Sequence, residues 1–191
     1  ESISQARSFM TAARAFARKK PIIVFKAGRF PESAKAAASH TGAIASEDTI
    51  YNAVFRRAGI ARVFDIGDIF DFTDLMGRKR IPKGSNLAIV TNAGGPGVMA
   101  TDTLIANNGK LCELSDETME KLNDLLPHFW SHGNPVDVLG DADPERFTKA
   151  TQIVLKDSGV DAVLVILTPQ AMTDPTGTAR EIAKISESTN K

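Results

Sequence analysis

The sequence predicts an α/β fold in which two doubly wound parallel sheets follow one another along the chain. Short apolar runs rich in β-branched residues alternate with segments whose apolar residues recur every three or four positions. The first pattern is typical of strands buried on both faces, and the second of amphipathic helices. Strands that alternate with helices form right-handed parallel units, and their ligands bind beyond the carboxyl ends of the strands.

The first half of the chain is predicted to alternate helices with two strands and one loop. Ser4 is a suitable N-cap for the first helix, and the positive charges of residues 18–20 close its last turn. Gly28, Pro31 and three consecutive alanines predict a mobile loop with room for one short helical turn, which leads to His40. In chain order, the expected ranges are helix 4–20, strand 22–25, loop 27–39, helix 47–58, strand 60–64 and helix 66–76.

A basic segment that contains proline and glycine, residues 78–85, reads as an exposed linker between the halves. We therefore expect a first domain at residues 1–78, a linker at residues 79–85 and a second domain at residues 86–191.

The second half repeats the alternation of strands and helices. A strand leads into a glycine-rich turn and a helix that stops at Asn108 and Gly109. Ser115 caps the next helix, and Asp143 with Pro144 starts another. Residues 160–167 form the longest candidate for a buried strand. The expected ranges are strand 87–90, helix 95–107, strand 110–114, helix 115–125, helix 143–155, strand 160–167 and helix 176–188.

Composition excludes several classes of function. Basic and acidic residues balance at 23 each, so no general attraction to nucleic acid or to anionic lipid is expected. The single cysteine, Cys112, argues against a disulfide framework and a zinc cluster, and it suits a reducing compartment such as the cytoplasm. His128 and His132 have no acidic or thiol partner at metal-ligand spacing. No apolar stretch reaches membrane length, and no signal peptide opens the sequence.

Both ends of the sequence suggest an excised fragment. The chain opens on Glu1 rather than on methionine, and it stops after a helical pattern where an alternating fold would place a further strand. We therefore expect the first and the last fold to be truncated.

Residues 39–46 place a histidine, His40, on a small-residue turn that feeds a helix. Imidazole can take up a phosphoryl group and release it near neutral pH. Gly42 and Ala43 allow the backbone to approach such a group closely. The alternative interpretation is that His40 is simply an exposed residue before a helix.

Residues 91–98 form a strand-to-helix turn with three glycines. Pro96 fits the first turn of the helix, so the N–H groups that follow it are expected to be free to bind an anion, for a gain of about 1 kcal/mol at an exposed site. The segment matches neither a Walker A sequence nor a dinucleotide fingerprint. The alternative is a tight turn with no ligand. Residues 134–137 most often form a turn, which should lie at the same sheet edge.

Four segments, residues 37–43, 87–97, 133–137 and 161–175, resemble the NDP-forming acyl-CoA synthetases of the succinyl-CoA synthetase superfamily. The match runs through nearly the whole chain in the same order. The resemblance implies two flavodoxin-like domains, with the end of the phosphohistidine domain at residues 1–78 and the second ligase-CoA domain at residues 86–191.

The resemblance also implies a reaction and its residues. Acyl-CoA, phosphate and ADP are exchanged with free acid, CoA and ATP through an acyl phosphate and a phosphohistidine. His40 matches the phosphorylated residue, Glu1 the glutamate that hydrogen-bonds it, and Asn134 and Asp137 an active-site loop. The implied phosphate-binding residues are Gly42, Ala43, Asn92, Gly94, Gly95, Gly97 and Val98.

The remaining ligands are expected outside this chain. CoA would bind an upstream CoA-binding domain, and ATP or ADP with Mg²⁺ would bind an ATP-grasp domain or subunit. The substrate is a small carboxylic acid, the full protein is expected to be an oligomer, and this fragment alone is expected to be inactive.

A second hypothesis is a regulatory, ligand-sensing region of a protein acetyltransferase, because the same domain set occurs there. The presence of His40 favours the enzyme. An acetyltransferase domain beyond Lys191 would favour the sensor, and an ATP-grasp domain the ligase.

Overall fold

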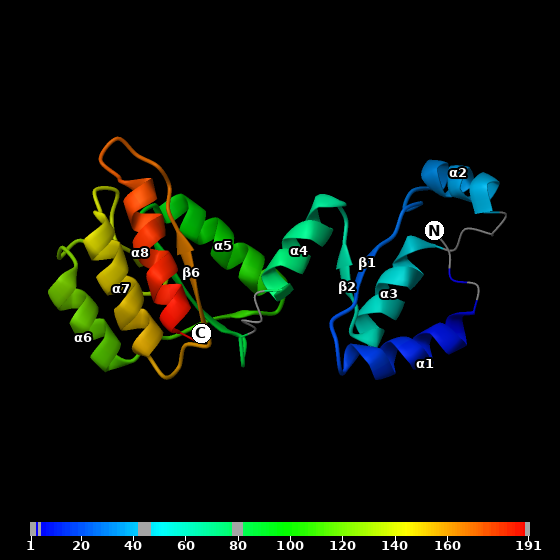
Figure 1. The fold of residues 1–191 in the computed structure, drawn as a ribbon, viewed down its shortest axis with the longest axis horizontal. Helices are drawn as coiled ribbons and strands as arrows, with labels where there is room; N and C mark the ends of the chain where they lie inside the picture. Colours follow the sequence, from blue (N-terminus) through cyan, green and yellow to red (C-terminus); the bar gives the residue numbers. More distant parts are fainter. Residues whose placement is uncertain (1–2, 4, 42–46, 78–81, 190–191) are drawn as a thin grey trace. The chain divides into compact units, whose positions relative to one another are not determined.

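The computed structural model describes residue 3 and residues 5–41, 47–77 and 82–189, without the side chains of residues 37–41. The chain divides into two compact units, Glu1–Lys79 and Arg80–Lys191. Every strand pair in the described part of the chain is parallel, and helices connect the strands (Figure 1). The predicted α/β class is therefore confirmed. No helix among these residues is both long and apolar enough to cross a membrane.

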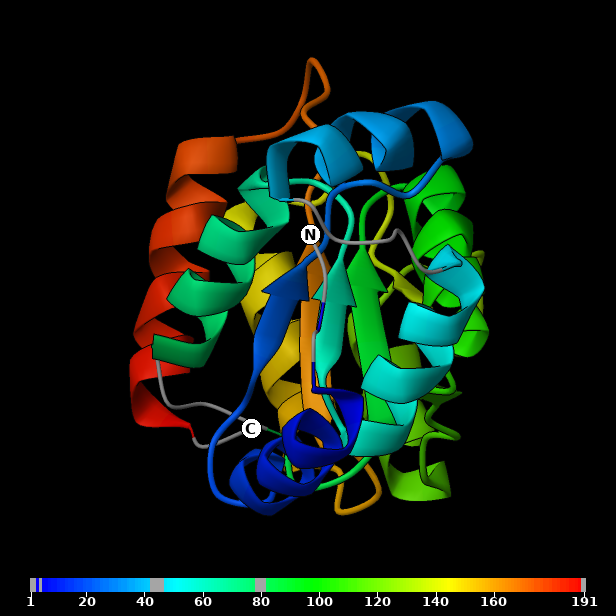
Figure 2. The same cartoon turned by 90° about the vertical axis from the view of Figure 1, so that its right-hand side faces the viewer.

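The first unit has a parallel pair of strands, β1 and β2, which run side by side in the same direction (Figure 2). Ile23 lies opposite Ala61, and Phe25 lies opposite Val63. Gly59, in the left-handed region with φ 74°, ends the helix before β2. The elements are α1 (Ala6–Ala17), β1 (Ile23–Phe25), α2 (Pro31–Thr41), α3 (Asp48–Ala58), β2 (Ala61–Val63) and α4 (Gly67–Gly77).

A small aromatic core joins α1 to α3. The rings of Phe9 and Phe55 meet edge to face with centroids 6.3 Å apart, and the ring of Tyr51 lies 5.8 Å from that of Phe55. Ala13 and Ile60 are buried in the same cluster. The prediction that β1 is buried on both faces is wrong for Phe25, which is 40% exposed, because β2 is its only strand neighbour among the described residues.

The helix α2, residues 31–41, differs most from expectation, since residues 27–39 were predicted to be a mobile loop with one short helical turn. Pro31 occupies the first helical position, where its fixed φ is favourable and its missing N–H costs nothing. The alanines that follow have the highest helix propensity of any residue. The backbone N–H of Ala34 already donates to the carbonyl of Phe30 (2.8 Å).

The second unit is built around β3, whose residues Ala88, Ile89 and Val90 are completely buried. The strand β6 runs along one edge of β3 from Leu87 to Thr91. The elements are β3 (Asn86–Thr91), α5 (Gly94–Ala106), β4 (Lys110–Leu111), α6 (Asp116–Leu125), β5 (Val136–Asp137), α7 (Pro144–Lys156), β6 (Ala162–Ile166) and α8 (Pro175–Ser188).

The other edge of β3 is shared by two short strands. β4 pairs with its beginning and β5 with its end. Between them, the side-chain amide of Asn134 accepts from the Ile89 N–H (2.9 Å) and donates to the carbonyls of Leu87 (3.0 Å) and Cys112 (2.9 Å). Asn134 thus completes the ladder where no strand is present. This explains why β4 ends earlier than the predicted residue 114.

Helices cover the two faces of this sheet. α7 packs against β3 and β6, with α6 and α8 on either side of it, and α5 packs against β3 and β4. Residues 160–167 were expected to be the longest buried strand, but β3 is longer and β6 is only partly buried. Within residues 82–189, β6 pairs with β3 alone, whereas β3 is central, and Leu164 on β6 is 39% exposed.

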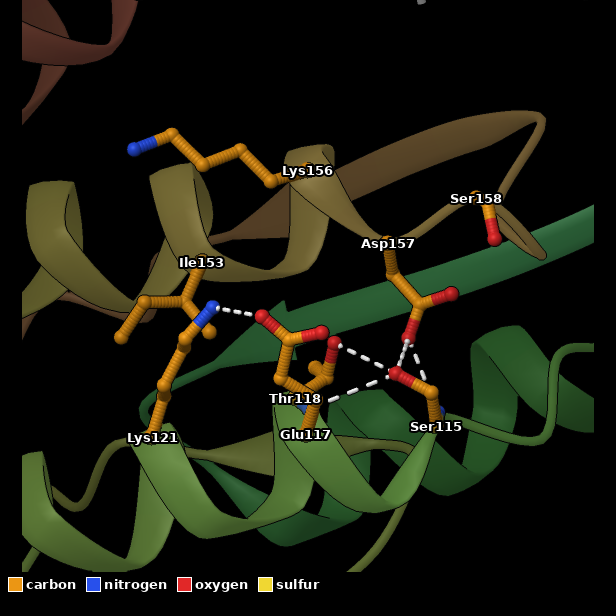
Figure 3. A pocket seen from close by; sticks show the side chains of 8 residues that line it. All are labelled: Ser115, Glu117, Thr118, Lys121, Ile153, Lys156, Asp157 and Ser158. Atoms are coloured by element: carbon orange, nitrogen blue, oxygen red, sulfur yellow. Dashed lines mark hydrogen bonds and ion pairs between the residues drawn. The ribbon is translucent and has the colours of Figure 1, made fainter.

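The carboxylate of Asp157 joins the end of α7 to the start of α6, beside a hollow of about 590 Å³ (Figure 3). Asp157 is 5% exposed, and it accepts hydrogen bonds from the N–H (2.8 Å) and the hydroxyl (2.9 Å) of Ser115. Its other oxygen accepts from the N–H of Gly159 (2.8 Å). Burial alone raises the pKa of Asp157. The hydrogen bonds from Ser115, Thr118 and Gly159 outweigh burial, and the pKa falls to about 2.

This network predicts an acid-labile second unit. A carboxyl pKa of about 2 in the folded state, against about 3.9 when unfolded, contributes roughly 2 kcal/mol of stability above pH 4, which is lost as the pH falls from about 4 to 2. Asp157→Asn should lower the free energy of unfolding at pH 7 by about this amount and flatten its pH dependence in that window. Fluorescence of Trp130, the chain's single tryptophan, which is buried in this unit, reports the unfolding.

Asp102→Asn is the matched control, because Asp102 is exposed on α5. The control should keep both the stability and the pH dependence of the wild type. An Asp157→Asn protein that loses stability below pH 4 as steeply as the wild type would contradict the assignment.

Candidate functional site

The predicted site residues fall in both units. His40 lies in the backbone of α2, close to its end, but its side chain is outside the described part of the structure. Glu1, Gly42 and Ala43 also lie outside the described residues. The other predicted residues all belong to the second unit, and the structure brings six of them to the carboxyl end of β3: Asn92, Gly94, Gly95, Gly97, Val98 and Asp137. Asn134 lies apart from them, because its side-chain amide bonds Leu87 and Ile89 in the first half of β3.

The start of α5 presents two backbone donors. Gly94 and Gly95 are the first residues of the helix, where an N–H group has no acceptor within the helix. Pro96 has no N–H, and the N–H of Gly97 donates to the carbonyl of Ala93 (3.4 Å). The expectation that the free N–H groups follow Pro96 is therefore wrong, because the helix ladder already begins at Gly97. The available donors precede the proline.

The glycines of this turn have different structural roles. A Cβ atom on Gly97 would lie 3.2 Å from the Thr91 methyl group and 3.4 Å from the Cβ of Pro135, so Gly97 lets α5 approach the sheet closely. A Cβ atom on Gly95 would have no neighbour within 4 Å. Gly94 and Gly95 are exposed, whereas Gly97 is buried. The fold therefore requires the glycine at position 97 but leaves open space above position 95.

Asn92 holds the turn in place. Its amide, 2% exposed, donates to the carbonyl of Thr168 (2.9 Å) and accepts from the N–H of the same residue (2.8 Å). The Nε2 of Gln170 donates to the Asn92 carbonyl (3.3 Å). These bonds tie the end of β3 to the segment after β6. Both polar atoms of the Asn92 side chain are bonded to the backbone of Thr168, so this residue stabilises the conformation of the turn.

Asp137 places a carboxylate beside the helix start. Its Oδ1 accepts from the N–H of Leu139 (2.9 Å), and its Oδ2 lies 3.8 Å from the position that a Cβ on Gly94 would take. Negative charge at a helix N-terminus is favoured by the helix dipole. An anion bound by the N–H groups of Gly94 and Gly95 would meet this carboxylate, so Asp137 favours a ligand that brings a proton or a cation with it. Val98 is 59% exposed on the next turn of α5.

The histidines of the second unit have internal contacts. Nδ1 of His132 lies 2.8 Å from Oδ1 of Asn123, and Nε2 lies 2.8 Å from the carbonyl of His128. Trp130 donates to the same Asn123 oxygen (2.9 Å). His132 therefore braces the segment between α6 and β5. Within the described ranges, no three histidine, cysteine or acidic side chains are grouped so that they could hold a metal ion.

Two contributors to the turn were missed by the sequence analysis. The hydroxyl of Thr91 lies 3.1 Å from the Ala93 N–H, which donates to it, so it fixes the residue that precedes the helix. Leu139 adopts a left-handed conformation (φ 73°) beside Asp137. A threonine just before an Asn-Ala-Gly segment was a usable signal for the first, whereas nothing in the sequence marks the second.

Comparison with known proteins places the chain in a family. Residues 1–76 match the family model described as succinyl-CoA ligase like flavodoxin domain, and residues 87–191 match the Ligase-CoA domain. The chain is 45% identical over 174 residues to an ADP-forming acetate–CoA ligase I of Archaeoglobus fulgidus, covering 91% of this chain and 25% of that relative. It is 39% identical to the alpha subunit of an ADP-forming acetate–CoA ligase I of Pyrococcus furiosus, covering 97% and 39%.

A solved structure agrees with these matches. It is a dinucleotide forming acetyl-coenzyme A synthetase 1 of Ca. Korarchaeum cryptofilum in complex with phosphate and ADP, with a TM-score of 0.89 and 36% identity over 98% of this chain and 40% of that one. The chain thus spans between a quarter and two fifths of the relatives named here. It belongs to the NDP-forming acyl-CoA synthetases of the succinyl-CoA synthetase superfamily.

Proposed function

We propose that this chain is part of an ADP-forming acyl-CoA synthetase and that His40 carries the phosphoryl group. The relatives named above are described as ADP-forming CoA ligases, and the matching solved structure is described with phosphate and ADP. These ligase descriptions give no support to the alternative of a regulatory region of an acetyltransferase. The observation that carries the proposal is the start of α5, where the N–H groups of Gly94 and Gly95 have no acceptor within the helix and a Cβ atom on Gly95 would have no neighbour within 4 Å.

In the proposed reaction the phosphoryl group moves in three balanced steps. Phosphate displaces CoA from acyl-CoA and gives an acyl phosphate and free CoA. A neutral nitrogen of His40 then attacks phosphorus, the bond between phosphorus and the acyl oxygen breaks, and the carboxylate leaves. A terminal oxygen of ADP finally takes the phosphoryl group from the imidazole and becomes part of ATP. Glu1 would hydrogen-bond the second ring nitrogen and fix its tautomer.

The start of α5 would hold the phosphate while it is transferred. Backbone N–H groups at a helix start point toward an anion, and they need no reorganisation as charge moves during the reaction. Gly94 and Gly95 supply these donors, and Gly42 with Ala43 would allow close approach beside His40. The Asp137 carboxylate next to Gly94 fits a site that releases its anion again, because it opposes the binding of an uncompensated dianion.

The remaining substrates would bind other parts of the complete enzyme. We propose that a CoA-binding domain precedes this chain and that an ATP-grasp domain or subunit holds ATP or ADP with Mg²⁺. The relative from Pyrococcus furiosus is described as an alpha subunit, which agrees with a divided enzyme. The acid substrate is a small carboxylic acid, and the enzyme would be an oligomer in the cytoplasm. The 191 residues alone would then be inactive as a ligase.

The role of His40 is tested by phosphorylation of the complete protein. Incubation with radiolabelled ATP and Mg²⁺ should give acid-labile, base-stable phosphate on the wild type, as expected for a phosphorus–nitrogen bond to imidazole. His40→Ala should abolish this label. His128→Ala, which removes an exposed histidine from the second unit, is the matched control and should label normally. Equal labelling of His40→Ala and the wild type would disprove the proposal.

The glycines of the α5 turn should separate stability from function. Gly95→Ala places a methyl group in open space, so it should keep or raise stability by about 0.5–1 kcal/mol through higher helix propensity, while it slows His40 phosphorylation by obstructing the anion. Gly97→Ala should lower stability by about 1 kcal/mol, because Thr91 and Pro135 must shift. Urea unfolding followed by Trp130 fluorescence measures the first effect, and the rate of labelling the second.

The outcome for Gly95→Ala decides whether this helix start binds phosphate. A variant that is stable and phosphorylated at the wild-type rate would show that the space above Gly95 has no part in the reaction.

A further inference from the structure

One buried ammonium group in the first unit contacts both ends of the segment that carries His40. Lys26 follows β1 directly and is 6% exposed. Its Nζ donates to the carbonyls of Ala27 (3.0 Å) and Gly28 (3.1 Å). Gly28 is in the left-handed region (φ 71°). The chain turns at this residue, and the carbonyls of Ala27 and Gly28 both point toward the Lys26 ammonium group.

The same ammonium reaches the start of α3. Nζ lies 3.6 Å from Oδ1 of Asp48, the first residue of that helix, and 4.5 Å from the ring centroid of Tyr51. The ring face attracts a cation, and the attraction is stronger when the group is desolvated. Lys26 therefore contacts residues 27 and 28 on one side and residues 48 and 51 on the other. Between them the chain makes a long excursion that includes α2 and His40.

Direct packing between the two ends is limited. A hollow of about 370 Å³ lies between them, lined by residues from the start of α2 and the start of α3, among them Phe30, Pro31 and Thr49. Across this space, the contacts of Lys26 with residues 27 and 28 and with Asp48 link the two ends, and the charge of Arg29 also acts on Asp48. Because Lys26 contacts the chain just before α2 and the first turn of α3, it can set the distance between the starts of these two helices.

Pairing with Asp48 does not by itself explain why the Lys26 ammonium group is buried. Asp48 already accepts a hydrogen bond of 2.7 Å from Arg62 on β2, whose other terminal nitrogen donates to Asn52. This bond holds the pKa of Asp48 below its usual value, burial opposes it, and the charges of Arg62, Lys26 and Arg29 lower it further. Asp48 would thus remain paired without Lys26. A buried cation is costly, and an apolar side chain of similar length would pack in its place.

We propose that Lys26 is a positioning residue for phosphoryl transfer, which holds the start of α2 at a fixed distance from α3 and so sets the placement of His40. The proposal rests on the proposed function of His40. It assigns the ammonium group a task that the core does not require: it binds two carbonyls of the chain entering α2 and, at the same time, the carboxylate and ring of the helix that follows. Loss of the charge frees one end of the excursion while the packing of α1 on α3 remains.

Lys26→Met tests the proposal because it keeps the apolar stem and removes the charge. In the complete protein with radiolabelled ATP and Mg²⁺, we expect the rate of His40 labelling to fall by about tenfold or more, with the final extent of labelling unchanged, because misplacement of a reacting group slows transfer steeply. The ATP concentration that gives half the maximal rate should stay the same. Lys26→Arg, which keeps a cation, should recover part of the rate.

Hydrogen–deuterium exchange supplies a readout that does not depend on activity. Lys26→Met should raise exchange in residues 28–36, at the entry to α2, and leave α3 and β1 unchanged. Lys20→Met is the matched control, since Lys20 is exposed in the same unit, and it should change neither rate nor exchange.

Two results would overturn the positioning role. One is labelling of Lys26→Met at the wild-type rate. The other is a general rise of exchange across α1, α3 and β1, which would assign Lys26 to the stability of the whole unit. If instead His40→Ala still carries the label, the proposed function fails, and the exchange of residues 28–36 still shows whether Lys26 holds this segment.

Discussion

The hydrogen bonding of strand β3 is the constraint on which the second unit depends. β3 is completely buried at Ala88, Ile89 and Val90, so a backbone group left without a partner there would cost about 1–3 kcal/mol. β6 satisfies one edge. At the opposite edge the described residues form two short strands, and the Asn134 amide supplies the missing donors and acceptor between them. A single side chain therefore stands in for a piece of strand.

The same constraint determines which groups remain for a ligand. At the carboxyl end of β3, the side-chain amide of Asn92 bonds the backbone of Thr168, and the Thr91 hydroxyl accepts from the N–H of Ala93. These side chains look polar and available in the sequence, yet the fold uses them to hold its own backbone. The groups left over are the N–H donors of Gly94 and Gly95, which no geometry within α5 can satisfy. The candidate site thus consists of backbone N–H groups that the hydrogen bonding of the sheet and of the helix does not use.

Periodicity predicted most of the elements because they have clear physical signatures. Apolar runs marked β3 and β6, and capping residues such as Ser115 and Asp143 marked helices at positions the structure confirms. The misses have equally specific causes. α2 was hidden because Pro31 signals both a loop and a first helical position. β5 was hidden because two residues carry no periodicity, and the Asn134 side chain, which extends that edge, gives no pattern along the sequence.

The candidate site was predicted in its location more than in its details. The glycine pattern identified the α5 turn, but the choice of donors depended on whether the ladder begins at Gly97, which only the backbone geometry decides. Lys26 was missed because a lysine after an apolar strand usually marks the surface, whereas here the chain turns at Gly28 and encloses it.

The two units meet one physical problem in different ways. In each, a parallel strand ends and the chain must turn into a helix at the edge where ligands bind. The second unit holds its turn with neutral amide and hydroxyl groups, which bond the backbone locally, and the charge beside this turn is that of the Asp137 carboxylate. The first unit uses a buried cation, Lys26, whose interactions with a carboxylate and a ring act over a longer range. Neutral bonds suit a turn that we propose to bind phosphate. A charge that contacts both ends suits a long segment whose middle carries the proposed phosphohistidine, His40.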